Sequence, residues 1–155
     1  METERIEVQR TIAASPAVIF KLLCDPRGHV QIDSSGMLQS ATGDSVGAVG
    51  DSFVVHMDRE SLNDYPMGLY DVTINIVTFV PDHEIAWTVL GKIRPLMGHV
   101  YGYVLEPVGA GTLVTSFYDW SNARDEWKEA GVYPVIPESA LRATLGILAR
   151  TVAPS

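Results

Sequence analysis

Residues 98–121, GHVYGYVLEPVGAGTLVTSFYDWS, constrain the fold of this chain more than any other segment. Two runs of alternating side chains are separated by Pro107, Gly109 and Gly111, as a tight turn requires. One side of the first run carries His99, Tyr101, Tyr103 and Leu105, and one side of the second carries Thr112, Val114, Ser116, Tyr118 and Trp120. The segment therefore predicts a long β-hairpin. Rings with a single polar atom suit a sheet face that borders a cavity better than a dry core.

The rest of the chain supplies strands first and a long helix last. Residue periodicity predicts strands at Arg5–Ile12, 37–42, 52–57, Leu69–Val80 and Glu84–Leu90, and short helices at Pro16–Cys24 and 27–34. A final helix is predicted from Pro137, with Leu141, Leu145, Leu148 and Val152 spaced 4, 3 and 4 residues apart. Strands followed by a helix indicate an α+β fold with an antiparallel sheet. One long helix across a curved sheet leaves unfilled volume between the two.

The composition of the 155 residues is that of an ordinary globular chain, which predicts one domain spanning 1–155. The apolar runs are too short for a membrane helix, and the charged start METERIEVQR does not resemble a signal peptide. Cys24 is the only cysteine, which favours a reducing, cytoplasmic location. Between Val30 and Gly91, nine acids minus one base give a charge of −8, equal to that of the whole chain. We therefore expect neither nucleic-acid binding nor stable insertion into a membrane.

Four segments carry a resemblance to a known superfamily. They are IEVQRTIAASPAVIFKLLCDP, VGAVGDSF, YGYVLEPVGAGTLVTSFYDW and VYPVIPESALRATLGILARTV. In their order and spacing the chain resembles the START-like superfamily, also called the Bet v 1-like or polyketide cyclase/dehydratase-like group. The tryptophan-rich stretch that members often have after the first helix is replaced here by GHVQID at 28–33.

The resemblance implies a helix-grip fold, in which a seven-stranded antiparallel sheet curves around the C-terminal helix and two short helices follow the first strand. It also implies an internal hydrophobic cavity. Members bind or transport lipids, sterols and polyketides, some cyclise or dehydrate polyketides, and others are chaperone cofactors or toxins that act on ribosomes. A fold does not choose among these activities, so the choice rests on the residues of this chain.

Two pairs of residues are candidates for acid–base chemistry. His29 and Asp33 are four residues apart, so on a helix they share a face and can form a hydrogen bond. The alternative for this pair is a surface contact or a local cap. His99 follows the strand alternation of Tyr101, and together they could polarise a ligand carbonyl or simply line the cavity. Which face of this strand points inward is open, because valines alternate on its other side.

A larger set of residues is expected to form the cavity and its mouth. For the wall we expect Trp87, Tyr101, Tyr103, Tyr118, Leu141, Leu145 and Leu148, and for the mouth Arg59, Arg94 and Trp127. No metal site and no cofactor are expected, because HxH, HExxH, CxxC, GxGxxG and Walker A patterns do not occur in the sequence.

The favoured hypothesis is a module that binds an apolar or amphipathic small molecule, lipid-like or polyketide-like, as a monomer or a homodimer. One alternative is a polyketide cyclase or dehydratase, which needs a positioned acid and base inside a closed cavity. The other is a protein-interaction module of the toxin or chaperone-cofactor type, in which the C-terminal helix or exposed aromatic residues contact a partner.

Overall fold

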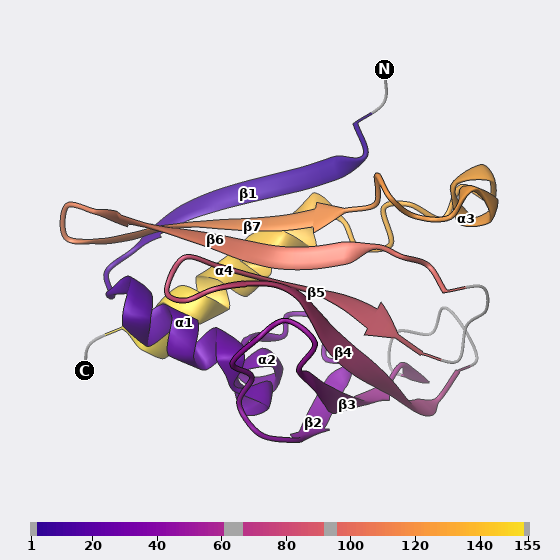
Figure 1. Cartoon of the computed structure of the whole chain (residues 1–155), viewed down its shortest axis with the longest axis horizontal. Helices are drawn as coiled ribbons and strands as arrows, with labels where there is room; N and C mark the ends of the chain where they lie inside the picture. The colour runs from indigo at the N-terminus through magenta and orange to yellow at the C-terminus, as the bar shows by residue number, and fades with distance from the viewer. Residues whose placement is uncertain (1–2, 61–66, 92–95, 154–155) are drawn as a thin grey trace.

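A seven-stranded antiparallel sheet dominates the computed structural model, which describes residues 3–60, 67–91 and 96–153 (Figure 1). The strands are β1 Arg5–Ile12, β2 Leu38–Thr42, β3 Ser52–Asp58, β4 Leu69–Val80, β5 Glu84–Leu90, β6 Val100–Val108 and β7 Gly111–Asp119. The helices are α1 Pro16–Cys24, α2 Pro26–Ile32, α3 Asp125–Glu129 and α4 Glu138–Val152. The predicted α+β helix-grip fold is confirmed, with two short helices after the first strand.

The strand order places β1, the first strand of the chain, beside β7, the last strand of the chain. The order is β1-β7-β6-β5-β4-β3-β2, and β1 pairs with β7 from Arg5↔Asp119 to Ile12↔Thr112. Figure 1 shows α4 lying across one face of the sheet, with α1 and α2 near its C-terminal end and α3 at the opposite end of the molecule. None of the described helices is long and apolar enough to cross a membrane.

The hairpin of β6 and β7 decides which side chains face the interior. Tyr101 pairs with Tyr118, and Tyr103 pairs with Ser116, so these side chains share the inner face of the sheet. On the outer face, Gly102 leaves room for the Phe117 ring, because a Cβ atom at residue 102 would collide with that ring. The aromatic face that the sequence singled out is therefore the inward one.

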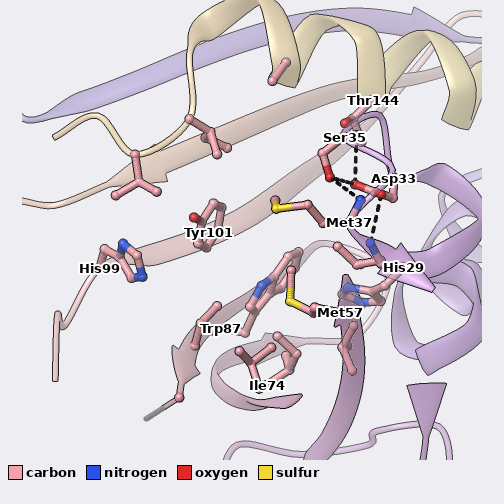
Figure 2. A pocket seen from close by; sticks show the side chains of 18 of the residues that line it. His29, Asp33, Ser35, Met37, Met57, Ile74, Trp87, His99, Tyr101 and Thr144 are labelled. Atoms are coloured by element: carbon pink, nitrogen blue, oxygen red, sulfur yellow. Dashed lines mark hydrogen bonds between the residues drawn. The ribbon is translucent and has the colours of Figure 1, made fainter. Parts of the chain in front are cut away.

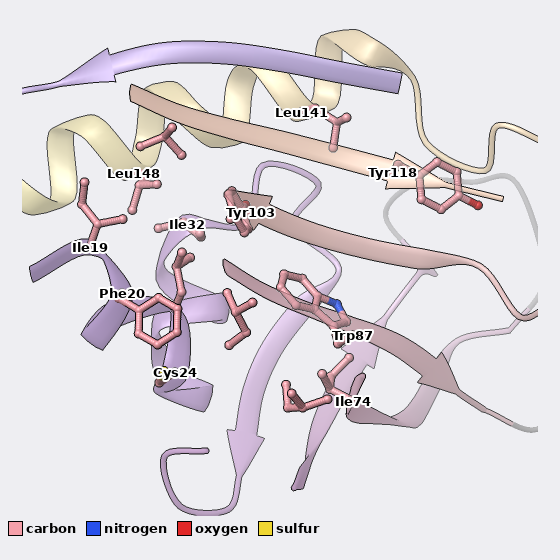
Figure 3. Close-up of a cluster of buried hydrophobic side chains, with 14 of the residues drawn as sticks. Ile19, Phe20, Cys24, Ile32, Ile74, Trp87, Tyr103, Tyr118, Leu141 and Leu148 are labelled. Carbon is pink, nitrogen blue, oxygen red and sulfur yellow. The ribbon is translucent and has the colours of Figure 1, made fainter. Parts of the chain in front are cut away.

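Helix α4 packs on the sheet through leucines at the predicted spacing. Leu141, Leu145 and Leu148 are all buried, and the helix contacts β1, β7 and α2. Figure 3 shows Leu148 toward Ile19 of α1 and Leu141 toward Tyr118 of β7. The C-terminal half of α4 is therefore part of a continuous hydrophobic core.

Candidate ligand-binding cavity

A cavity of about 330 Å³ lies between the sheet and the N-terminal half of α4. Ala140, Leu141 and Thr144 line it from the helix. Figure 2 shows Thr144 on the helix side and Ile74 and Trp87 on the sheet side. Helix α2, residues 33–38 and strands β3 to β6 supply most of the remaining wall. The cavity therefore occupies the volume that the leucines of α4 fill further along the helix.

The structure places much of the predicted wall around this cavity. Trp87, Tyr101, Tyr103 and Leu141 line it, and so do His29, Asp33, His99 and Arg59. Tyr118, Leu145 and Leu148 do not line it and are instead buried in the adjoining core. Trp127 lies on α3 and is not among the lining residues, and Arg94 lies outside the described residues.

Four methionines form a part of the wall that sequence reasoning missed. Met37, Met57, Met67 and Met97 all line the cavity, and Met1 is the only other methionine in the chain. No periodic pattern links them, because they come from distant parts of the sequence. Met57 lies in β3 one residue before its end, and the other three precede β2, β4 and β6 by one to three residues. Unbranched thioether side chains adapt to irregular shapes, so this wall can accommodate more than one ligand outline.

The corner between α1 and α2 positions His29. Asp25 ends α1 and also caps the N-terminus of α2. Gly28 allows the two helices to approach closely, because a Cβ atom at this residue would collide with the Leu22 carbonyl. As a result, His29 Nε2 lies 2.8 Å from the carbonyl oxygen of Leu23. The helix corner therefore holds the imidazole against the preceding helix by a backbone hydrogen bond.

His29 is buried and uncharged. A carbonyl oxygen only accepts hydrogen bonds, so Nε2 donates to Leu23 and carries the ring proton. The imidazole packs edge-on against Trp87 and Phe53, with ring centroids 4.7 and 5.0 Å away. Burial lowers the pKa of His29 to about 4, although the Leu23 hydrogen bond and the charge of Asp25 oppose this shift. At neutral pH, Nδ1 is therefore a hydrogen-bond acceptor only.

Asp33 does not form the predicted pair with His29. Helix α2 ends at Ile32, two residues earlier than predicted, so the i,i+4 geometry of a continuing helix does not reach Asp33. The carboxylate instead accepts hydrogen bonds from the backbone N–H groups of Ser35, Gly36 and Leu38 and from the Ser35 hydroxyl, over 2.8–3.2 Å. This is the alternative considered for the pair, a local cap, and it fixes the segment that leads into β2.

His99 marks the other end of the cavity (Figure 2). Its Nδ1 lies 2.6 Å from the Tyr118 hydroxyl, and its ring is edge-on to Tyr101, with centroids 5.3 Å apart. Burial lowers the pKa of His99 to about 4. The imidazole is therefore neutral at neutral pH and is held in place by a tyrosine hydroxyl. Tyr118, which lies outside the lining, thus acts on the cavity through His99.

A series of packed aromatic rings supports this histidine. Tyr101 and Tyr118 have ring centroids 4.6 Å apart, Tyr118 and Trp120 are 5.5 Å apart, and Trp120 stacks on Tyr133 at 5.9 Å. Burial raises the pKa of Tyr101 and of Tyr118 well above the ordinary value of 10.0. Both hydroxyls therefore stay protonated and can donate as well as accept a hydrogen bond.

Apolar side chains reach the solvent where the cavity opens. Met67, Leu96 and Val135 line the cavity and are 38%, 40% and 39% exposed, respectively. Arg59 lines the same cavity, and its Nη1 lies 3.1 Å from Met37 Sδ. The lining thus includes apolar side chains that reach the solvent and the guanidinium group of Arg59.

A second polar cluster lies on the outer face of the sheet. Thr42 Oγ1 lies 2.7 Å from His56 Nε2, and His56 Nδ1 lies 2.8 Å from Asp71 Oδ1. Hydroxyl, imidazole and carboxylate in this order resemble an activated nucleophile. None of the three lines the cavity, and the His56 and Asp71 side chains are 38% and 62% exposed, so the cluster stands open to solvent. In the described residues, no group of three or more His, Cys, Asp or Glu side chains could hold a metal ion.

A sheet that grips a long helix, with an apolar cavity between the two, defines a START-like protein. The chain belongs to the family described as polyketide cyclase / dehydrase and lipid transport, whose sequence profile matches residues 3–153. The resemblance read from the sequence is thereby confirmed. No curated protein matches the chain.

Solved structures of low sequence identity share this fold. Protein CV1439 from Chromobacterium violaceum has a TM-score of 0.71 at 16% identity, with 98% of this chain and 99% of that chain covered. The Aha1 dimer from Colwellia psychrerythraea has a TM-score of 0.63 at 18% identity, covering 97% and 96%. Protein NE0264 from Nitrosomonas europaea has a TM-score of 0.65 at 16% identity, covering 97% and 95%. At these identities the likeness establishes the fold alone.

Proposed function

We propose that the protein binds an apolar or amphipathic small molecule in the cavity between the sheet and α4. The observation that carries the proposal is the wall itself. Its volume of about 330 Å³ falls within the roughly 300–1,000 Å³ that small-molecule sites occupy. Aromatic, aliphatic and methionine side chains make up most of the lining, while His29, His99 and Arg59 supply a few polar groups.

Burial of apolar surface would supply most of the affinity. Removing roughly 300 Å² of apolar surface from water gives about 7 kcal/mol at ~25 cal/mol per Å². The loss of translational and rotational freedom offsets a large part of this gain. The polar groups of the wall then determine how the ligand is oriented.

Filling the cavity tests the proposal. In Ala140→Trp, an indole ring occupies the cavity from the first turn of α4, whereas Ser139→Trp places the same ring on the exposed side as a control. Melting temperature is measured with a panel of fatty acids, sterols and aromatic polyketides. We expect ligands to raise it for the wild type and for Ser139→Trp, but not for Ala140→Trp. Equal shifts in both variants, or no shift in any protein, would count against the proposal.

A second function, cyclisation or dehydration of a polyketide, is favoured by the His99–Tyr118 hydrogen bond at the wall. An imidazole held by a hydroxyl can move a proton at a carbon next to a ligand carbonyl. The pKa of about 4 makes His99 a weak base at neutral pH, and for this reason binding is the first proposal.

Turnover of an aromatic polyketide precursor distinguishes the two functions. For an enzyme, His99→Ala abolishes turnover while the ligand still raises the melting temperature. If the wild type binds the precursor and returns it unchanged, the protein is a binding module. Turnover that survives in His99→Ala removes this histidine from the chemistry.

A further inference from the structure

The two ends of the cavity differ in the hydrogen bonds that they offer. Figure 2 shows His29 at one end and His99 at the other, with Trp87 and Tyr101 between them. Arg59 also lines the cavity, and the lining residues Met67, Leu96 and Val135 reach the solvent. A ligand that fills the cavity therefore meets a different polar group at each end.

The Nδ1 atom of His29 is available to a ligand. Within residues 3–60, 67–91 and 96–153, the hydrogen bond of this ring is the one from Nε2 to Leu23. No fully buried side-chain nitrogen or oxygen in that same part of the chain lacks a hydrogen-bond partner. Nδ1 therefore keeps accessible surface, and His29 lines the cavity.

Aromatic rings pack against this imidazole, namely those of Trp87 and Phe53. Ile32, on α2 with His29, and Met57, on β3 with Phe53, line the cavity. A ligand that displaces water from this end leaves Nδ1 without a partner unless the ligand itself supplies a proton donor. An acceptor placed there meets another acceptor, which is unfavourable.

We infer that His29 selects ligands that present a hydrogen-bond donor, a phenolic or alcoholic hydroxyl or a ring N–H, to its Nδ1 atom. The inference rests on the proposed binding function and specifies the ligand for it. Ethers, esters and carboxylates only accept hydrogen bonds, so this end of the cavity rejects them.

The lining adds a preference for flat ring systems. Trp87 and Tyr101 lie opposite each other on β5 and β6, with their rings nearly parallel at 14° and 6.3 Å between centroids. Together with the methionine wall, these rings border a compact volume suited to one small aromatic ligand. The ligand class is therefore a hydroxylated aromatic molecule whose hydroxyl points toward α2.

A matched pair of probes tests the selection. 2-Naphthol and 2-methoxynaphthalene share one ring system and differ in a single donor, and quenching of tryptophan fluorescence gives their dissociation constants. We expect 2-naphthol to bind the wild type at least about tenfold more tightly. His29→Phe should lose this preference, and His56→Phe, on the outer face, should keep it. Equal affinity of both probes for the wild type overturns the inference and leaves cavity binding intact, whereas binding of no aromatic or lipid probe overturns both proposals.

Nitrogen NMR of the wild-type protein provides a test that does not depend on the folding of a variant. Long-range proton–nitrogen spectra should show His29 protonated at Nε2 and unprotonated at Nδ1. Addition of 2-naphthol should move the His29 Nδ1 resonance, while the methyl ether should not. A proton on Nδ1, or a resonance that both probes leave in place, refutes the role of this atom. The imidazole of His56 serves as the internal control.

Discussion

At the scale of single residues, two histidines are kept neutral by the cavity in which they lie. His29 gives its one ring proton to a backbone carbonyl, and His99 is held by a tyrosine hydroxyl. Neither imidazole has a carboxylate within hydrogen-bond distance in the described part of the chain, so the cost of charging it in a buried site dominates its pKa. Protonation of either ring therefore works against the folded state.

The free energy of unfolding should fall in mild acid. Burial lowers the pKa of His29 and of His99 from 6.5 to about 4, so between these pH values the unfolded chain binds more protons. The stabilisation is complete above about pH 6.5 and is lost as the pH falls to about 4, by up to roughly 3 kcal/mol per histidine. Urea unfolding at about pH 7 and pH 4.5 measures this loss, and His99→Phe should reduce it. Equal stability of the wild type at both pH values would contradict the expectation.

At the scale of elements, α4 combines two environments along one face. Its C-terminal half is packed against the core, and its N-terminal half borders the cavity. Leu148 has no exposed surface and does not line the cavity, whereas Leu141 does line it. Truncation of each leucine to alanine therefore removes a different amount of side-chain packing.

Truncation of these two leucines should give unequal losses of stability. Leu148→Ala creates a new cavity in close-packed surroundings and should cost about 3–5 kcal/mol. Leu141→Ala enlarges a volume that already exists, so its cost should be nearer 2 kcal/mol, at the low end for such changes. Denaturant unfolding measures both values. Leu141→Ala should also admit bulkier ligands, and equal losses for the two variants would mean that the cavity is filled by side chains in solution.

Periodicity predicted the elements well, because each depends on neighbours in sequence. The bounds of β1, β4, β5 and α1 agree with the prediction, and α4 begins one residue later than predicted. Contacts across the fold were harder to anticipate. The pairing of His29 with Asp33 assumed that α2 continues to residue 33. The helix ends at Ile32, and the Asp33 carboxylate accepts hydrogen bonds from the backbone that follows, such as the N–H group of Gly36. The methionine wall was missed because its members meet only in three dimensions.

At the scale of the whole molecule, the two sheet strands that are farthest apart in sequence pair with each other. β1 lies beside β7, with Arg5 opposite Asp119 and Ile12 opposite Thr112, so about a hundred residues separate the paired strands. Arg5 reinforces the junction by its hydrogen bond to Asp119 and by its position over the Phe117 ring. Native pairing of β1 therefore has to wait until β7 is in place.

This topology predicts slow, cooperative folding. Long-range strand pairing in sheet-rich proteins gives folding times of milliseconds to seconds, because loop closure precedes the stabilising contacts. Stopped-flow refolding followed by tryptophan fluorescence should show a main phase in this range. Unfolding should be a single transition by both fluorescence and circular dichroism. Relaxation in microseconds, or two separate transitions, would indicate that the two ends of the sheet fold independently.

The four methionines of the cavity wall also make the site chemically vulnerable. Oxidation turns a thioether into a polar sulfoxide, and reductases can restore it. Met67, 38% exposed at the mouth, is open to oxidants from solvent. Because the chain has a buried Cys24 as its only cysteine, sulfur oxidation would alter the lining of this cavity before any thiol chemistry. Loss and recovery of ligand binding would then report on the oxidative state of the surroundings.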